Sequence, residues 1–168
     1  MVYIKNLKII KIIKMKKILT ILLVLFSLNL VAQESELEWH TDVTKAINIS
    51  METEKPLFFF FTGSDWCGWC IRLQKEVFFK PEFAKWANEN IVLVELDFPR
   101  RKKLDESLRQ QNDNLRQMFG VRGYPTGWIV VPEIEDKQVN FKRLGSQGYV
   151  KGGPSAWIAG ANKMLMKK

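Results

Sequence analysis

Residues 56–70 of the 168-residue chain read PLFFFFTGSDWCGWC, and this stretch decides the fold. Its first half is a continuous apolar run over 57–62, typical of a central strand that is covered on both faces. Its second half holds the chain's two cysteines, Cys67 and Cys70, directly before apolar residues at helical spacing. The sequence therefore predicts a buried strand that turns into a helix, with the cysteine pair at the turn.

This placement of the cysteines suits reversible disulfide chemistry. The first backbone N–H groups of a helix lack partners and the aligned peptide dipoles leave partial positive charge, so a thiolate at Cys67 is stabilised there. The thiolate is the nucleophilic form of cysteine. Cys70 lies about one turn later on the same face, within reach of Cys67 once that residue is bonded to a substrate sulfur. We predict that Cys67 attacks and Cys70 resolves.

Three other uses of the cysteine pair each meet an objection. A zinc or iron–sulfur site needs more ligands than two cysteines supply, and His40 has no patterned partner, so we expect no metal. Covalent haem attachment requires histidine directly after the second cysteine, where this chain has Ile71. A purely structural disulfide would close so short a loop that it removes little entropy from the unfolded chain.

Residues 1–32 are predicted to be a secretory signal peptide. They contain six lysines and no acid, and Met15-Lys16-Lys17 precedes an apolar run from Ile18 to Ala32. This run of 15 residues is shorter than the roughly 20 that a spanning helix needs. We expect cleavage near Ala32, with a retained membrane anchor as the alternative, and translation could start at Met15.

The net charge of +8 belongs largely to this leader. Six of the 26 Lys and Arg residues lie in it, which leaves 20 basic against 18 acidic side chains in the rest of the chain. That balance removes the case for nucleic-acid binding. Export would place the dithiol where disulfides form and persist. We therefore expect a periplasmic protein, with secretion or membrane anchoring as alternatives.

Residues 33–168 read as one domain of the α/β class. Helical spacing predicts helices over 38–53, 67–79, a short segment from Pro81, 105–119 and 154–166, and apolar runs predict strands over 57–62, 91–96, 127–131 and 138–143. Gly120 is expected to end the third of the long helices, and the glycines from Gly145 to Gly153 to form turns. This order predicts a mixed central sheet of about four to five strands flanked by helices.

With these elements placed, the chain resembles the thioredoxin superfamily over roughly residues 38–166. Two motifs carry the resemblance: WCGWC over 66–70 at a strand-to-helix turn, and VRGYPT over 121–126 before a later strand. Residues 61–70 are similar to exported thioredoxin-like proteins related to the periplasmic domain of transmembrane thiol carriers. The resemblance implies an exposed nucleophile at Cys67, a buried resolving thiol at Cys70 and a cis proline at Pro125 facing them. Backbone groups of Tyr124 would then pair with an extended substrate.

Two positions depart from the family pattern. Thioredoxins carry a buried acid where this chain has Phe61, and Gly-Pro where it has Gly68-Trp69. The missing acid removes the usual proton acceptor for Cys70. Glu95 on the neighbouring predicted strand could replace that acid if its side chain points toward Cys70, or it could face solvent.

Several residues around the motif allow two interpretations each. Trp66 and Trp69 could form an apolar rim that excludes water and grips a peptide, or could simply pack. Asp65 could repel the nearby thiolate or cap the helix. The basic run over 100–103 could dock an acidic partner, or be solvated as charged loops usually are.

We expect an exported thiol:disulfide oxidoreductase that reduces or exchanges protein disulfides through a mixed disulfide at Cys67, without a bound cofactor. Its expected partners are proteins with disulfides or thiols and a dithiol electron-donor protein, which could be membrane-bound. The chain itself is expected to be a monomer. The alternatives are a thiol oxidase or disulfide isomerase, and a thioredoxin-like peptide-binding module without redox turnover. The residues between the cysteines tune the reduction potential that decides the direction of electron flow.

Overall fold

A computed structural model of the chain describes residues 37–136 and 138–168. The signal peptide predicted over 1–32 lies outside the described residues. Within these described ranges, no helix is long and apolar enough to cross a membrane. The elements in chain order are β1 (Trp39–His40), α2 (Val43–Thr53), β2 (Leu57–Thr62), α3 (Gly68–Leu73), the π-helix η1 (Gln74–Phe78), α4 (Pro81–Asn90), β3 (Val92–Asp97), α5 (Glu106–Met118), β4 (Thr126–Glu135), β5 (Gln138–Gln147) and α6 (Gly153–Leu165).

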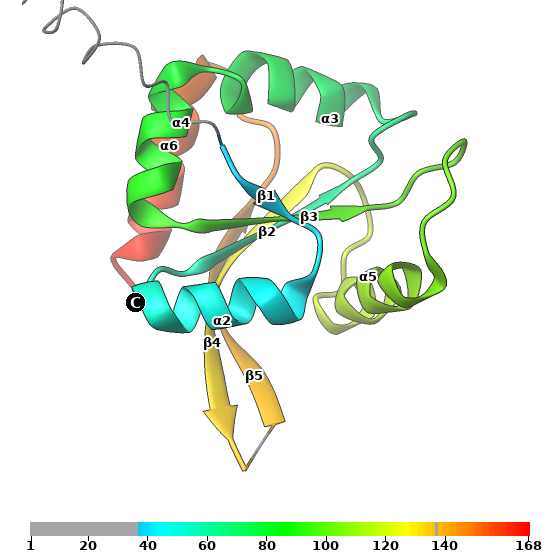
Figure 1. The fold of residues 1–168 in the computed structure, drawn as a ribbon. Coiled ribbons are helices and arrows are strands. Elements are labelled where there is room, and N and C mark those ends of the chain that lie inside the picture. The colour runs from blue at the N-terminus through cyan, green and yellow to red at the C-terminus, as the bar shows by residue number, and fades with distance from the viewer. Residues whose placement is uncertain (1–36, 137) are drawn as a thin grey trace, which may run out of the picture. The chain divides into compact units, whose positions relative to one another are not determined.

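The strands form one sheet in the order β1-β3-β2-β4-β5. The central strand β2 is parallel to β3 and antiparallel to β4, and the outer strands β1 and β5 pair with β3 and β4. Helices α3, α4 and α6 cover one face of this sheet, and α2 and α5 cover the other (Figure 1). The mixed sheet between two helical layers confirms the predicted α/β class.

The apolar run of β2 exists because this strand is buried on both faces. Successive side chains of a strand point to opposite faces, so Phe58 and Phe60 pack with α3, η1, α4 and α6, whereas Phe59 and Phe61 pack with α2 and α5. Each of the four rings is at most 1% exposed. Such continuous burial is what a central strand between two helical layers requires.

Trp157 holds α6 against the sheet. Its side chain is fully buried, and its ring meets the edges or faces of Phe58, Phe78 and Phe83 at centroid distances of 5.3, 5.5 and 5.4 Å. Its indole N–H donates to the carbonyl of Gly148 at 3.2 Å. A buried tryptophan therefore satisfies its one polar group while filling the layer between β2, α4 and α6.

The first helix is shorter than the predicted range 38–53. Trp39 belongs to β1, which pairs with β3, and the helix begins only at α2. The reason is local, because the carboxylate of Asp42 accepts the backbone N–H groups of Thr44 and Lys45 at 2.9 and 3.2 Å. This side chain caps the helix and fixes where it starts.

The helix predicted over 67–79 consists of two parts. The α-helical α3 continues into the π-helical η1 without a break, since Leu73 at the end of α3 and Gln74 at the start of η1 both have right-handed helical backbone angles. The segment ends at Phe79, whose N–H donates to the carbonyl of Gln74 at 2.8 Å.

Strands β4 and β5 are longer than predicted, and one predicted turn is wrong. Pro132 pairs within β4, and Gly145 lies in β5 rather than in a turn. A Cβ at Gly145 would stand 2.5 Å from the sulfur of Met164, so glycine lets α6 approach the strand. Gly120 has φ 61°, as expected for the residue that ends α5. Gly152 precedes α6 with φ 118°, in the predicted turn.

We predict that Trp157→Ala lowers the free energy of unfolding by about 3–5 kcal/mol, because it leaves a cavity among buried rings. Urea denaturation of the oxidised protein measures the loss. Phe79→Ala is the control, since this ring is 67% exposed and its removal should change stability by less than about 1 kcal/mol. Equal losses for the two variants would contradict the central packing role of Trp157.

Candidate active site

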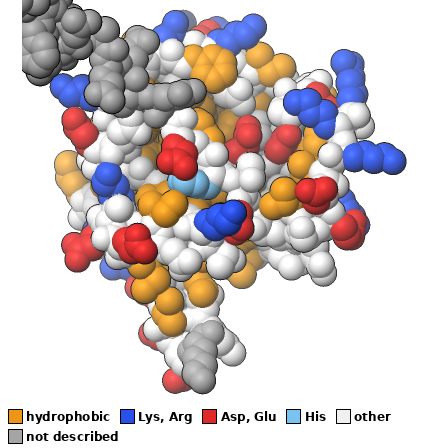
Figure 2. Space-filling model, viewed as in Figure 1, with side chains coloured by type: hydrophobic (Ala, Val, Ile, Leu, Met, Phe, Trp, Pro, Cys, Tyr) orange, Lys and Arg blue, Asp and Glu red, His pale blue; other side chains and the backbone are white. Residues whose placement is uncertain are grey.

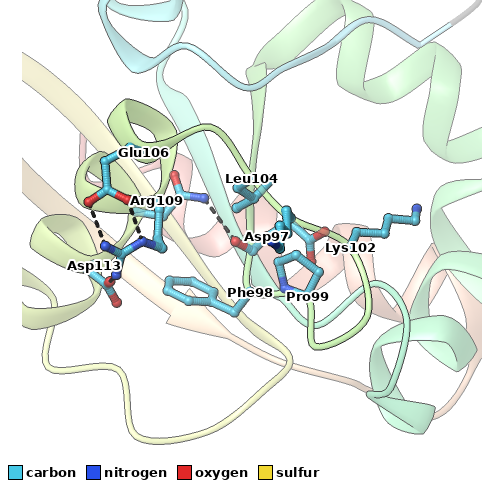
Figure 3. A pocket seen from close by; sticks show the side chains of 10 residues that line it. Asp97, Phe98, Pro99, Lys102, Leu104, Glu106, Arg109 and Asp113 are labelled. Atoms are coloured by element: carbon cyan, nitrogen blue, oxygen red, sulfur yellow. Dashed lines mark hydrogen bonds and ion pairs between the residues drawn. The ribbon is translucent and has the colours of Figure 1, made fainter.

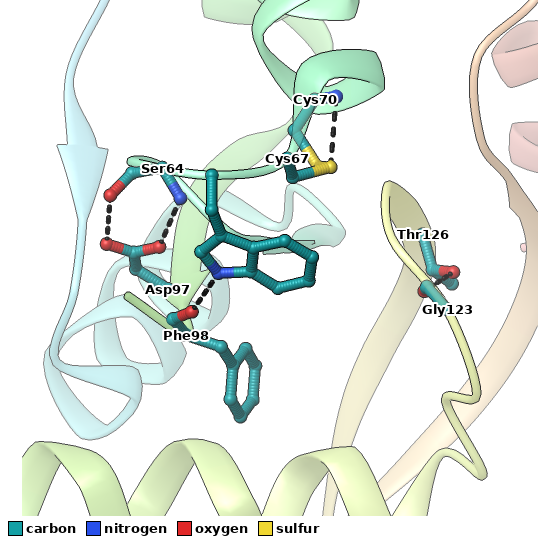
Figure 4. Close-up of a disulfide and its surroundings, with 8 residues drawn as sticks. Ser64, Cys67, Cys70, Asp97, Phe98, Gly123 and Thr126 are labelled. Atoms are coloured by element: carbon teal, nitrogen blue, oxygen red, sulfur yellow. Dashed lines mark hydrogen bonds between the residues drawn. A yellow bond between two sulfur atoms is a disulfide. The ribbon is translucent and has the colours of Figure 1, made fainter. Parts of the chain in front are cut away.

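Cys67 and Cys70 form a disulfide with an S–S distance of 2.05 Å and a Cα separation of 5.2 Å. Cys67 is the N-cap residue of α3, and the N–H of Cys70 donates to the Cys67 sulfur at 3.2 Å, the contact drawn in Figure 4. The Cys67 sulfur therefore lies at the positive end of the helical segment formed by α3 and η1. That position stabilises a thiolate after reduction.

The two cysteines differ in exposure. Cys67 is 6% exposed and Cys70 is fully buried. In this disulfide form Cys67 is thus more covered than the resemblance implied, because Trp66 and Tyr124 pack against the apolar cluster that contains both cysteines. The geometry lets an incoming sulfur reach Cys67 before Cys70.

The turn that leads into the disulfide depends on Gly63. Its carbonyl accepts the N–H groups of Trp66 and Cys67 at 3.3 and 2.9 Å. A Cβ at this position would stand 2.5 Å from the Trp66 ring, which only glycine avoids. The indole N–H of Trp66 donates to the carbonyl of Phe98 at 2.8 Å, so this tryptophan is fixed on both sides.

The peptide bond between Tyr124 and Pro125 is cis. The preceding ring of Tyr124 meets Trp66 at 5.7 Å and Phe98 at 5.2 Å between centroids, and burial raises the pKa of its phenol. Gly148 approaches the backbone here, since a Cβ on it would stand 2.8 Å from the carbonyl oxygen of Pro125. Trp66 and Tyr124 thus lie against each other and pack on the apolar cluster that contains both cysteines, and the cis peptide bond directly follows Tyr124.

Trp69 is 55% exposed and lies on a supporting cluster that sequence reasoning missed. Its ring meets Tyr149 at 5.1 Å, and the Arg72 guanidinium lies 5.2 Å from the Trp69 centroid and 5.1 Å from the Tyr149 centroid. Glu76 accepts the Tyr149 hydroxyl at 2.6 Å and the Arg72 Nε at 2.8 Å, and these bonds lower the pKa of Glu76. The i,i+4 spacing of Arg72 and Glu76 was visible in the sequence. The contribution of Tyr149, over 70 residues away, was not.

Asp65 does not cap the helix, which was one of the two roles considered for it. The helix N-cap is Cys67, and the Asp65 carboxylate instead accepts the backbone N–H groups of Arg100, Arg101 and Lys102. These bonds lower the pKa of Asp65, and the bond from Arg100 has the largest effect. Asp65 therefore joins the turn before the disulfide to the loop that follows β3.

A second link between the same two segments comes from Ser64. Its backbone N–H and hydroxyl donate to the Asp97 carboxylate at 2.8 and 2.6 Å (Figure 4). With the bonds of Asp65 and Trp66, three consecutive residues hold the end of β3 and the loop after it against the active-site turn.

Glu95 is half-buried and lines a cavity of about 210 Å³ with Trp39, Phe60, Gln74, Phe78 and Phe79. Burial first, and repulsion by Asp97 second, raise the pKa of Glu95. The carboxyl lies on the face of the sheet that η1 covers, the face whose cluster includes Cys70, but Cys70 does not line this cavity. Gln74, which lines the cavity together with Glu95, follows Cys70 by about one helical turn. Within residues 37–136 and 138–168, no group of three or more His, Cys, Asp or Glu side chains is placed to hold a metal ion.

Comparison with known proteins shows the family to which this fold belongs. Residues 43–146 match the family described as a thioredoxin-like domain. The disulfide bond reductase DsbH of Chlamydia pneumoniae is 34% identical over 131 residues, which cover 78% of this chain and 74% of that protein. The thioredoxin-related protein DsbJ of the same organism is also 34% identical over 131 residues, covering 74% of this chain and 36% of DsbJ.

Two solved structures share the architecture. A DsbH oxidoreductase superposes with a TM-score of 0.69 at 31% identity, covering 80% of this chain and 88% of the other. A thioredoxin from Thermus thermophilus superposes with a TM-score of 0.58 at 14% identity, covering 78% and 88%. The similarity to the Thermus thermophilus thioredoxin, at this low identity, shows a shared fold and nothing more.

We predict that Glu95→Gln makes the oxidised protein more stable than the wild type at neutral pH, and equally stable in acid. A raised pKa means that the folded state binds this proton more tightly than the unfolded state. The wild type therefore loses stability as pH rises from the ordinary value of 4.5 through the raised value, whereas the glutamine variant does not. Urea denaturation at a series of pH values measures the difference, with Glu89→Gln on the exposed side of α4 as control. A difference that does not depend on pH would contradict the burial argument.

Proposed function

This chain belongs to the thioredoxin-like domain family and is a thiol–disulfide oxidoreductase, and from that premise we propose that it reduces protein disulfides outside the cytoplasm. The observation that carries the proposal is the Cys67–Cys70 disulfide at the N-terminus of α3. The reducing direction is supported by the similarity to a protein named as a disulfide bond reductase. Export is supported by the leader over residues 1–32, with its lysines and apolar run.

The reaction proceeds by two thiol–disulfide exchanges. The reduced Cys67 thiolate attacks one sulfur of a substrate disulfide, which forms a mixed disulfide and releases the other substrate sulfur as a thiolate. Cys70 then loses its proton and attacks the Cys67 sulfur, which restores the disulfide seen here and releases the second substrate thiol. Two electrons pass to the substrate, and a dithiol donor protein must supply two more to regenerate Cys67 and Cys70.

Glu95 is our candidate for the proton acceptor of Cys70. Its raised pKa suits a carboxylate to that transfer, since a general base works best when its pKa approaches the working pH. The cavity that it lines reaches Gln74, in the turn after Cys70. Slower resolution of the mixed disulfide in Glu95→Gln, with an unchanged rate of attack by Cys67, is the signature of this role.

Four residues around the disulfide form the proposed substrate surface. Trp69 supplies an exposed aromatic plane, and Trp66 and Tyr124 supply a half-buried apolar rim. In the proposal, backbone groups of Tyr124, beside the cis bond to Pro125, pair with an extended substrate strand. The proposed substrates are therefore disulfides in exposed, extended segments of proteins.

We predict that Cys67→Ser abolishes insulin reduction, because it removes the attacking sulfur, while Cys70→Ala retains attack but cannot resolve. The Cys70→Ala variant should accumulate a mixed disulfide with its substrate, detected as a covalent adduct on non-reducing gels. Retention of reductase activity by Cys67→Ser would contradict Cys67 as the attacking sulfur, whereas a wild type that does not reduce insulin would leave a peptide-binding module.

The reduction potential of the wild type separates a reductase from an oxidase or isomerase. Equilibration with glutathione should give a value closer to roughly −270 mV than to roughly −120 mV. A value near the upper figure would overturn the reducing direction while leaving the exchange chemistry intact.

We also predict that Trp69→Ala lowers kcat/KM for insulin reduction by up to about tenfold, since it removes an aromatic contact worth about 0.5–1.5 kcal/mol. Met51→Ala is the control, because Met51 is a similarly exposed apolar residue at 50% and lies on α2, on the other face of the sheet. Equal kcat/KM values for the two variants would show that Trp69 does not touch substrate.

A further inference from the structure

We propose that residues 100–103, named here the basic loop, form a docking surface for an acidic segment of the partner protein whose disulfide or dithiol reacts with Cys67. The proposal rests on the proposed function and adds to it the chemistry of the partner. Its four residues, Arg100, Arg101, Lys102 and Lys103, are all exposed.

The basic loop is fastened directly beside the active-site turn. The carboxylate of Asp65, two positions before Cys67, accepts the backbone N–H groups of Arg100, Arg101 and Lys102 at 3.0, 2.7 and 3.2 Å. A solvated charge run has no need of such an anchor. Three bonds to one carboxylate fix the backbone of the loop within two residues of the nucleophile.

The first cation of the loop is also in contact with the active-site motif. The Arg100 guanidinium lies 3.8 Å from the centroid of the Trp66 ring, the residue adjacent to Cys67. A cation over a tryptophan face is attracted by the ring quadrupole. Positive charge therefore reaches the rim at which substrate enters.

The remaining cations of the loop are not held in ion pairs, and the carboxylates that interact with them from nearby are Asp65 with Arg101 and Glu95 with Lys102. None of Arg101, Lys102 and Lys103 forms an ion pair with an acid in the part of the chain that the structure describes. Figure 2 shows Lys and Arg side chains gathered on the side of the molecule where the loop between β3 and α5 lies. Because the chain after residue 32 is nearly balanced in charge, this is a local excess.

A cavity of about 440 Å³ lies next to the basic loop, between it and α5 (Figure 3). Lys102 and Lys103 line it together with the apolar side chains of Phe98, Pro99 and Leu104. Three acids also line the cavity, and each has a hydrogen-bond or ion-pair partner within the protein. Glu106 and Asp113 pair with Arg109, and Asp97 accepts Ser64. An acidic segment that carries one apolar side chain fits such a surface.

A protein partner is favoured over other polyanions because of where the charge lies. The reactants of Cys67 are protein sulfurs, so whatever reacts there must cover the residues around Trp66. Complementary charge at that point accelerates encounter, and salt screens the effect over about 10 Å at 0.1 M ionic strength. The basic loop would therefore act on the rate of partner association.

Three synthetic peptides test the proposal. They share one disulfide loop and are flanked by four aspartates, four serines or four lysines, and stopped-flow tryptophan fluorescence gives the second-order rate constant for their reduction by the reduced protein. We expect the aspartate peptide to react at least about tenfold faster than the lysine peptide at low salt, with the difference shrinking in high salt. Equal rate constants for the three peptides would overturn the docking surface, whereas failure to reduce any peptide would overturn the proposed function.

A charge-matched pair of variants locates the effect. Arg101→Gln/Lys102→Gln/Lys103→Gln should lose most of the preference for the aspartate peptide and keep the rate constant for the serine peptide. Lys45→Gln/Lys85→Gln/Lys142→Gln removes the same charge from exposed positions elsewhere and should keep the preference. Equal losses in both variants would assign the preference to net charge and contradict the proposal. Sedimentation with phosphatidylglycerol vesicles that depends on the basic loop, without any peptide preference, would assign the loop to a membrane surface instead.

Discussion

The burial of β2 on both of its faces is the constraint on which the rest of the structure depends. Phe58 and Phe60 fill one apolar layer and Phe59 and Phe61 the other, while the strand is hydrogen-bonded along both edges. A strand held in this way has little freedom to shift, because every displacement opens a cavity in one layer or the other. The chain leaves this strand at Thr62, and the active-site turn begins at the next residue. The disulfide is therefore attached to a strand whose residues are all buried.

Polar contacts set the orientation of the site once the core has set its position. The turn before the disulfide, the loop after β3 and the backbone beside Pro125 come from distant parts of the sequence. The hydrogen bonds that Ser64 and Trp66 donate and those that Asp65 accepts join the first two, and the rings of Trp66 and Tyr124 join the first and third. The proposed sulfur chemistry depends on this arrangement, since it requires Cys67 to accept a substrate while Cys70 stays covered.

The position of the acid is where this chain departs most from the pattern it resembles. Phe61 stands where thioredoxins carry a buried acid, and here its ring stacks with Phe98 and packs near Phe119 on the layer that α2 and α5 cover. A carboxylate there would be buried among aromatic rings. Glu95 is on the neighbouring strand and faces the layer that contains Cys70, in a cavity that raises its pKa. A half-buried carboxyl group is thus present in this chain too, but on the face of the sheet opposite to Phe61.

The sequence by itself determined the central strand, the helix that follows it, the chemistry of the cysteine pair and the family, because each of these depends on residues close together in the chain. Periodicity misplaced the start of α2, which a cap at Asp42 decides, and the ends of β4 and β5, which the pairing of these two strands with each other decides. Only the tertiary structure showed that Tyr149 supports Trp69 and that Asp65 binds the basic loop. Contacts of this kind join residues over 30 positions apart, and no local pattern encodes which distant side chain will meet which.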